Sequence, residues 1–132
     1  MRAGFFVDEN DLALGKALAS AHGHVVYPDH PELPEVPRGS LDDQWLPVIG
    51  QARLVVITRD QKIRYRVVEK RMWLDHAVRG FVLTGRTSQS TAGSLAVLMT
   101  HWSEISALVA SRPDGPWMYG VTVERVREID LS

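Results

Sequence analysis

Runs of hydrophobic residues alternate along the chain with helical patterns, and the strongest run lies in residues 53–60, Arg-Leu-Val-Val-Ile-Thr-Arg-Asp. Four consecutive apolar residues, three of them β-branched, are typical of a strand buried on both faces, as in a parallel sheet. Further strands are predicted at residues 3–7, 24–27, 80–84 and 117–123. Strands that alternate with helices predict an α/β fold, a three-layer sandwich in which a mainly parallel central sheet carries helices on both faces.

The first two helices are indicated by apolar stripes and by capping residues. A stripe from Leu14 to Ala21 predicts a helix that Asn10 or Asp11 caps. The sequence Ser-Leu-Asp-Asp at 40–43 resembles a capping box, and a short helix through Trp45 is expected after it. Pro47 should kink this helix or delay its start.

Two more helices are expected in the second half of the chain. After Asp60 the pattern becomes helical through Val67, Val68 and Met72. A stripe at residues 95–109 then keeps helical spacing for four turns and predicts one long helix. Between the second strand and the second helix, the four prolines of residues 28–40 exclude regular structure, and so long a loop is usually functional or mobile.

Composition narrows the class of protein. The 132 residues are expected to form a single domain, residues 1–132, and a net charge of −1 makes no global electrostatic case for nucleic acid. The chain has no cysteine, which excludes disulfides and thiolate metal sites. It also has no apolar run of the ~20 residues that span a membrane, and it begins directly with a strand. We therefore expect a cytoplasmic protein with no membrane partner.

Carboxylates follow the two most clearly buried strands. Asp8 follows the first strand and Asp60 the central one, and the carboxyl ends of parallel strands form one edge of a sheet, where α/β proteins bind ligands. Asp42 is the third candidate, with Glu9 and Asp43 as alternates. Carboxylates gathered in this way repel one another unless a cation or a proton is present, and Mg²⁺ prefers oxygen ligands. The sequence therefore favours a metal site able to support phosphodiester cleavage.

Ordinary structural roles remain open for the same residues. Asp8, Asp43 and Asp60 each stand where a residue can cap a helix. Residues 59–71 are strongly basic, which is typical of a solvated helix face but also of phosphate binding. Beside an acidic site that admits a polyanion, the second interpretation gains weight, and Arg59, Lys62 and Arg64 are the candidates to bind substrate phosphate.

Three short motifs together resemble a known family. Asp-Glu-Asn at 8–10, Asp-Asp-x-Trp at 42–45 and Val-Ile-Thr-Arg-Asp at 56–60 resemble the PIN-like domains of small bacterial toxins, in a subgroup with D-E-N, D-x-x-W and T-R-D motifs. The likeness runs from about residue 4 to residue 84. One departure is Lys62, which stands where many relatives continue T-x-D-x-D with another acid.

The resemblance implies a function and partners. PIN domains bind Mg²⁺ or Mn²⁺ through acidic residues and cleave RNA, and in VapC-type members an antitoxin protein blocks that activity. By this resemblance Asp8, Asp42 and Asp60 are the metal-binding and catalytic residues of a toxin endoribonuclease. Two alternatives remain: a non-catalytic PIN-like module that binds RNA or protein, and a receiver-like phosphoacceptor domain. A homodimer formed through the long helix or the last strand is also open.

Overall fold

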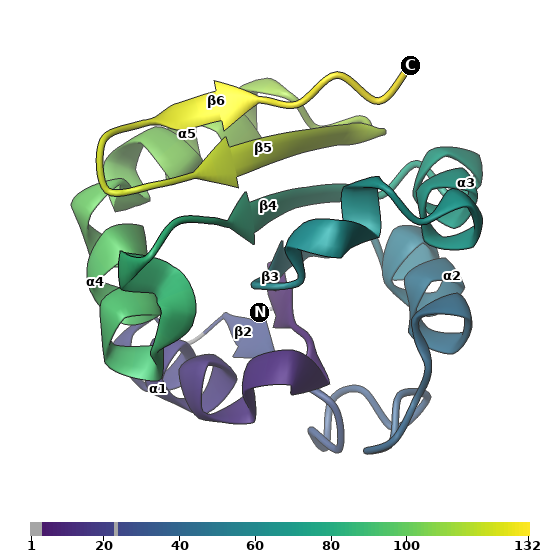
Figure 1. Ribbon diagram of the computed structural model, residues 1–132. Coiled ribbons are helices and arrows are strands. Elements are labelled where there is room, and N and C mark those ends of the chain that lie inside the picture. Colours follow the sequence, from purple (N-terminus) through teal and green to yellow (C-terminus); the bar gives the residue numbers. More distant parts are fainter. Residues whose placement is uncertain (1–3, 23) are drawn as a thin grey trace.

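The sheet has six strands, and the predicted architecture is confirmed. The computed structural model describes residues 4–22 and 24–132, so residue 3 of the first predicted strand lies outside the described part. The strand order is β2-β1-β3-β4-β5-β6, parallel throughout except for β6, which pairs antiparallel with β5 (Figure 1). The strands are β1 (Phe5–Val7), β2 (Val25–Val26), β3 (Val55–Thr58), β4 (Arg79–Leu83), β5 (Trp117–Val121) and β6 (Val126–Glu128).

Helices cover both faces of this sheet, which completes a three-layer α/β sandwich (Figure 1). The α-helices are α1 (Leu12–His22), α2 (Asp42–Ala52), α3 (Val67–Asp75), α4 (Thr91–Thr100) and α5 (Trp102–Ser111). Three short 3₁₀ helices also follow strands: η1 (Glu9–Asp11), η2 (Gln61–Arg64) and η3 (Thr87–Gln89). Helices α2 and α3 lie on one face, and α1, α4 and α5 lie on the other (Figure 1).

The central strand explains why the sheet is buried on both sides. In β3, Val56 packs with Trp45 of α2, whereas Val55 and Ile57 pack with the residues of α1 and α4. Successive side chains of a strand point to opposite faces, so an unbroken apolar run supplies both layers of core. All four residues of β3 are buried, as the sequence predicted.

The single long helix predicted over residues 95–109 is wrong, because the chain breaks there into α4 and α5. His101 leaves the helical conformation, with φ −107° and ψ 11°. Its Nε2 lies 2.8 Å from the carbonyl oxygen of Thr122 and 3.1 Å from that of Val123. The apolar stripe continues through the break, so hydrophobic periodicity alone could not reveal it.

Two local predictions also need correction. The expected capping box at residues 40–43 does not form: α2 begins at Asp42, with Pro47 inside it, and its N-cap Leu41 has no side-chain acceptor. Only the reciprocal bond is present one residue later, from the Leu41 N–H to Gln44 Oε1 at 2.7 Å. In α3 the expected apolar stripe is not buried at its start, since Val67 is 80% exposed and Val68 is 59% exposed. These valines lie on the solvent side of α3.

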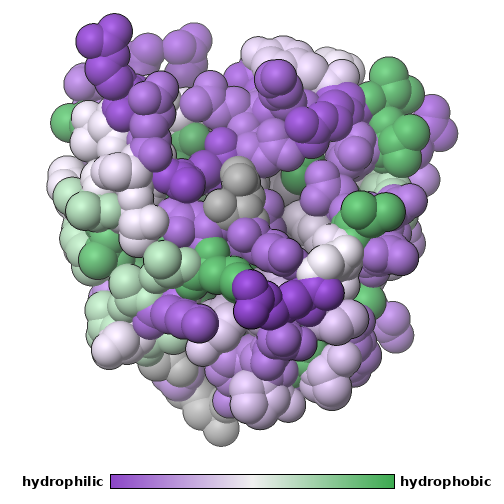
Figure 2. Space-filling view, turned by 60° about the horizontal axis from the view of Figure 1, so that its bottom comes forward, coloured by the Kyte–Doolittle hydropathy of each residue, from purple (hydrophilic) through white to green (hydrophobic). Residues whose placement is uncertain are grey.

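Within residues 4–22 and 24–132, none of the helices combines the length and apolar character that crossing a membrane requires. Figure 2 shows a face that is mainly hydrophilic, with hydrophobic side chains in small separate patches.

Candidate active site

Asp8 leaves strand β1 at the carboxyl edge of the sheet and is nearly buried, with 6% of the residue exposed. The Thr58 hydroxyl donates a hydrogen bond to Asp8 Oδ2 at 3.0 Å. The other oxygen, Asp8 Oδ1, is buried and has no hydrogen-bond partner within the described residues. Although Asp8 precedes η1, its side chain makes no capping bond to it. Asp8 is therefore not held by a capping role, and one of its oxygens is free to bind a ligand.

The electrostatic environment of Asp8 favours its protonated form. Burial raises its pKa from 3.8 to about 7, against the lowering effect of the Thr58 hydrogen bond. The carboxylates of Asp42, Asp60 and Asp11 raise this pKa further. Like charges shift a pKa in this way only when they are close, so the three predicted acids influence one another across this edge of the sheet.

Thr58 connects two of the predicted acids. Besides donating to Asp8, its hydroxyl oxygen accepts a hydrogen bond from the backbone N–H of Asp60 at 3.0 Å. Asp60 in turn caps η2, because its Oδ1 accepts from the Lys62 N–H at 3.1 Å. The structure thus confirms the capping interpretation for Asp60. The second carboxylate oxygen, Oδ2, takes no part in the cap and accepts a hydrogen bond from Arg66.

Asp42 enters the same region from the first turn of α2. Its Oδ1 accepts a hydrogen bond from Trp45 Nε1 at 3.0 Å, and Trp45 is only 3% exposed. The indole packs against Phe6 of β1, with ring centroids 5.0 Å apart. Trp45 is therefore a core residue that orients Asp42. Burial raises the pKa of Asp42, and the neighbouring Asp60 carboxylate adds to that effect.

Arg66 is the cation of this site. Its Nη1 lies 2.6 Å from Asp60 Oδ2 and 3.7 Å from Asp42 Oδ2. The hydrogen bond to Asp60 raises the pKa of the guanidinium, which stays charged. Arg66 therefore lies between two carboxylates and reduces the repulsion between them.

As arranged, the acids do not form a complete metal cage. In residues 4–22 and 24–132, no three His, Asp or Glu side chains lie close enough together to hold a metal ion. Two observations nevertheless fit a hard divalent ion: the donors are carboxylate oxygens, and Asp8 Oδ1 is buried without a partner. A metal held by Asp8, Asp42 and Asp60 requires that the guanidinium of Arg66 move aside.

Arg59 turns away from Asp60 and toward the opposite layer. Its Nε lies 3.4 Å from Asp11 Oδ2, and its Nη1 donates to the Ser88 carbonyl at 3.3 Å. Asp11 also caps α1 through the Leu14 N–H, as expected, and accepts from the Thr91 hydroxyl. The side chain of Asn10, the alternative cap, lies outside the described part. In this arrangement Arg59 helps to join α1 to the loop before α4.

Lys62 and the two alternate acids occupy more open positions. A cleft of about 500 Å³ beside Asp60 is lined by Lys62, Tyr65 and Arg66 among others. Glu9 accepts a hydrogen bond from the Gly39 N–H and so holds the loop that leads into α2. Asp43 is exposed as the second residue of α2. Arg64, the third phosphate candidate, lines a different groove, described below.

Sequence reasoning missed three residues that hold the acids in place: Thr58, Trp45 and Arg66. Thr58 and Trp45 stand within motifs that were recognised, but neither was assigned a role in positioning the acids. Arg66 was part of a basic run whose members could not be separated without their contacts. The one available signal was that Thr58 and Asp60 are two residues apart at the end of a strand, a spacing that places side chains on the same face.

Comparison with known families supports the resemblance in part. Residues 3–85 match a family model described as PIN like domain. The comparisons with curated proteins and with solved structures each gave no match. The matched segment holds more than half of the chain, including β1 to β4 and the three acids, and the chain therefore belongs to the PIN-like domain family.

Proposed function

We propose that this PIN-like protein is a metal-dependent endoribonuclease that hydrolyses RNA phosphodiester bonds at Asp8, Asp42 and Asp60, with Mg²⁺ or Mn²⁺ as cofactor. PIN-like domains are often nucleases, which supports the reaction class. The observation that carries the proposal is Asp8 Oδ1, a buried carboxylate oxygen without a partner at a sheet edge shared with two further acids. A buried polar oxygen without a hydrogen-bond partner is costly, and a bound ion would supply the missing partner.

The residues around the acids have separable roles in this proposal. When bound, the metal ion supplies charge neutralisation and an activated water. Thr58 holds Asp8 and the Asp60 backbone in register through one hydroxyl. Trp45 keeps Asp42 directed at the site. Arg66 holds the carboxylates of Asp42 and Asp60 together and would be available to a substrate phosphate if a metal ion took its place on them.

The biological setting is also a proposal. The motifs at 8–10, 42–45 and 58–60 resemble those of VapC-type toxins, and on that basis we propose that the protein is the toxin of a toxin–antitoxin pair. An antitoxin protein is then its physiological partner. Induced expression in a bacterial host should arrest growth, and Asp8→Asn should abolish the arrest at equal protein level. Growth arrest that persists in Asp8→Asn would contradict the toxin role of this site.

The reaction is tested on a mixed RNA pool with the purified full chain. Cleavage should require Mg²⁺ or Mn²⁺, stop with EDTA and disappear in both Asp8→Asn and Asp60→Asn. Asp75→Asn is the matched control, because Asp75 is exposed at the end of α3. Thermal unfolding of each variant distinguishes lost chemistry from lost structure. Cleavage by the wild type that resists EDTA would exclude the proposed metal site.

A second candidate is a PIN-like module that binds without catalysis. Arg66 favours it, since a guanidinium already pairs with Asp42 and Asp60. Lys62 also stands where many relatives carry an acid. This candidate predicts metal-independent RNA or protein binding and no cleavage by pure, folded protein. The receiver-like alternative is not supported by the family match.

A further inference from the structure

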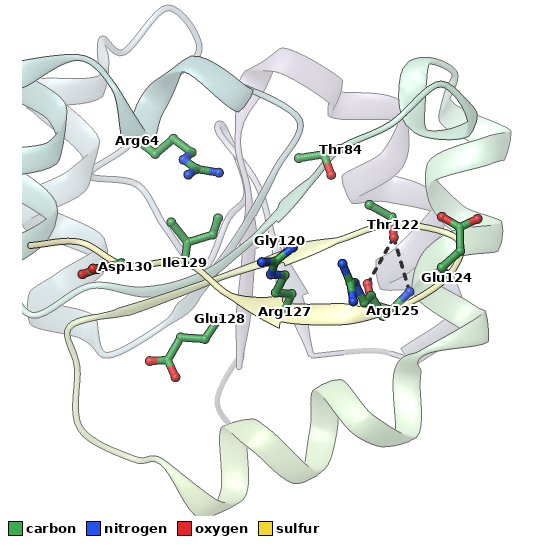
Figure 3. Close-up of a pocket in the computed structure, with 10 residues that line it drawn as sticks. All are labelled: Arg64, Thr84, Gly120, Thr122, Glu124, Arg125, Arg127, Glu128, Ile129 and Asp130. Atoms are coloured by element: carbon green, nitrogen blue, oxygen red, sulfur yellow. Dashed lines mark hydrogen bonds between the residues drawn. The ribbon is translucent and has the colours of Figure 1, made fainter.

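A groove of about 850 Å³ lies between the β5–β6 hairpin and the end of η2 (Figure 3). Three arginines line it: Arg64 from η2, and Arg125 and Arg127 from the hairpin. Thr84 and Thr122 line the same groove, after the ends of β4 and β5. The Thr122 hydroxyl is bonded to the backbone of Arg125 within the turn, so only that of Thr84 is offered to a ligand (Figure 3). Guanidinium and hydroxyl groups are the donors that proteins use most often for phosphate.

The three guanidinium groups are available to a ligand. In the ranges that the structure describes, none of them takes part in an ion pair. Arg64 stacks only on its neighbour Tyr65, 4.8 Å from the ring centroid. Figure 3 shows the side chains of Arg125 and Arg127 extending from the same side of the hairpin.

Three carboxylates also line the groove, and one of them, Glu128, is neutralised by an ion pair. Glu128 Oε2 pairs with Arg112 Nη1 at 2.8 Å, and its side chain extends from the side of β6 opposite to Arg127 (Figure 3). Asp130 Oδ1 accepts a hydrogen bond from the Ser132 N–H at 2.9 Å. Glu124 lies at the turn, at one end of the groove (Figure 3). Asp130 stays charged but lies at the other end of the groove, so the charge between the two ends is positive (Figure 3).

The alternation of β6 explains this arrangement. Val126 packs against the core layer of α1, α4 and α5, and Ile129 packs against the layer of α2 and α3. Since strand residues alternate between faces, Arg127 of β6 points to the face opposite Val126. Arg125 lies in the turn just before the strand and extends from the same side as Arg127 (Figure 3). The sequence places two cations along one line on the groove wall.

Gly120 keeps the floor of the groove open. It pairs with Arg127 across β5 and β6, and directly paired residues lie on the same face. A Cβ added at Gly120 would meet Ile129 Cδ1 at 3.5 Å, an ordinary contact, so a small side chain is tolerated. A large side chain would instead extend into the groove.

The groove and the acidic site are connected by η2. Asp60 caps the start of this 3₁₀ helix and Arg64 is its last residue. Four residues at ~2.0 Å each span roughly 8 Å. Ile63, which is 1% exposed, anchors η2 in the core, so the two sites keep a constant separation. A polyanion long enough to occupy the groove therefore also reaches Asp60.

We propose that this groove binds the phosphodiester backbone of single-stranded RNA, as a second phosphate subsite beside the acidic site. The identification of the strand as substrate rests on the proposed nuclease function. Cations spread along an open groove fit successive backbone phosphates better than one free phosphate ion. Tyr65, which is 70% exposed and adjacent to Arg64, offers a ring on which a base can stack.

The test measures binding separately from cleavage. A fluorescent RNA of about 12 nucleotides is titrated with the full chain in EDTA, and anisotropy gives Kd at several salt concentrations. Arg127→Gln should weaken binding about fivefold and lower the slope of log K against log salt by about 0.7, the value for one phosphate contact. Arg125→Gln with Arg127→Gln should double that loss of slope. Arg71→Gln, an exposed arginine of α3, should leave both values unchanged.

Two further arms make the result decisive. Gly120→Leu leaves the charge unchanged but fills the groove, and should also weaken RNA binding, whereas Gly120→Ala should not. Thermal unfolding checks that each variant is folded. Unchanged RNA binding in both the arginine and the Gly120→Leu variants would overturn the proposal, as would equal competition by a mononucleotide. Asp8→Asn should keep RNA binding in EDTA. Absence of cleavage by the wild type with intact RNA binding would therefore contradict the nuclease proposal and leave the groove proposal standing.

Discussion

Arg66 Nη1 lies 2.6 Å from Asp60 Oδ2, and this ion pair places a protein cation where a divalent ion is expected. The same nitrogen lies 3.7 Å from Asp42 Oδ2. A guanidinium and a divalent ion this close together repel each other, so they compete for the same carboxylate oxygens. Arg66→Gln should therefore strengthen Mn²⁺ binding severalfold, as measured by titration calorimetry.

The control for this experiment is Arg71→Gln, which removes the same charge from an exposed position on α3. It should leave Mn²⁺ affinity within error of the wild type. If Arg66→Gln binds Mn²⁺ no better than Arg71→Gln, then Arg66 does not obstruct the ion.

The pKa of Asp8 predicts an unusual dependence of stability on pH. Because burial raises this pKa from 3.8 to about 7, the folded protein holds a proton between these values that the unfolded chain has lost. The contribution of Asp8 to the free energy of unfolding is therefore fully present below pH 3.8 and falls as pH rises to about 7. Within this window the free energy of unfolding should fall by up to about 1.4 kcal/mol for each unit that the pH rises.

Asp8→Asn should remove that slope and stabilise the folded protein above about pH 7, by a few kcal/mol at most. Urea unfolding at about pH 5 and about pH 8 measures the difference from the wild type. Asp75→Asn should keep the wild-type pH dependence. Parallel curves for the wild type and Asp8→Asn would show that Asp8 ionises normally in the fold.

Among the residues that hold the acids in place, Thr58 should tolerate substitution least. Its hydroxyl is fully buried and serves Asp8 as donor and the Asp60 N–H as acceptor. Thr58→Val keeps the shape but leaves both partners unsatisfied, which costs about 1–3 kcal/mol. It should also raise the pKa of Asp8, since the lost hydrogen bond lowers it. Thr58→Ser retains the hydroxyl and should preserve both properties. Equal stability of the valine and serine variants in urea would refute this role.

A substitution of Trp45 can distinguish its packing in the core from its hydrogen bond to Asp42. Trp45→Phe keeps an aromatic ring against Phe6 but removes the Nε1 donor to Asp42. We expect a stability loss of about 1 kcal/mol, together with a larger fall in RNA cleavage and in Mn²⁺ affinity. Trp73→Phe is the comparison, because Trp73 Nε1 donates to a backbone carbonyl of β5 away from the acids. An equal loss of cleavage in both variants would mean that only core packing was disturbed.

The elements nearest the site were predictable because their signals are local. The apolar run of β3 and the shorter run of β1 each reported burial on both faces, and both lie within one sheet. Parallel pairing then brings Asp8 and Asp60 to one edge without further information. The edge strand β6 was not foreseen, since three residues with only one apolar member have no distinctive period.

The sequence by itself determined the α/β sandwich, because hydrophobic periodicity records which face of each element is buried, and it placed Asp8 and Asp60 directly after two strands of that sheet. Only the tertiary structure decided what those acids touch. It directed Arg66 to Asp60 and Arg59 to Asp11, although both arginines belong to one basic run. It also assembled Arg64 with Arg127 in one groove across 62 intervening residues. The partner of a charged side chain leaves no periodic pattern in the sequence, unlike a buried apolar face. It depends on which groups come close in space once the layers have packed.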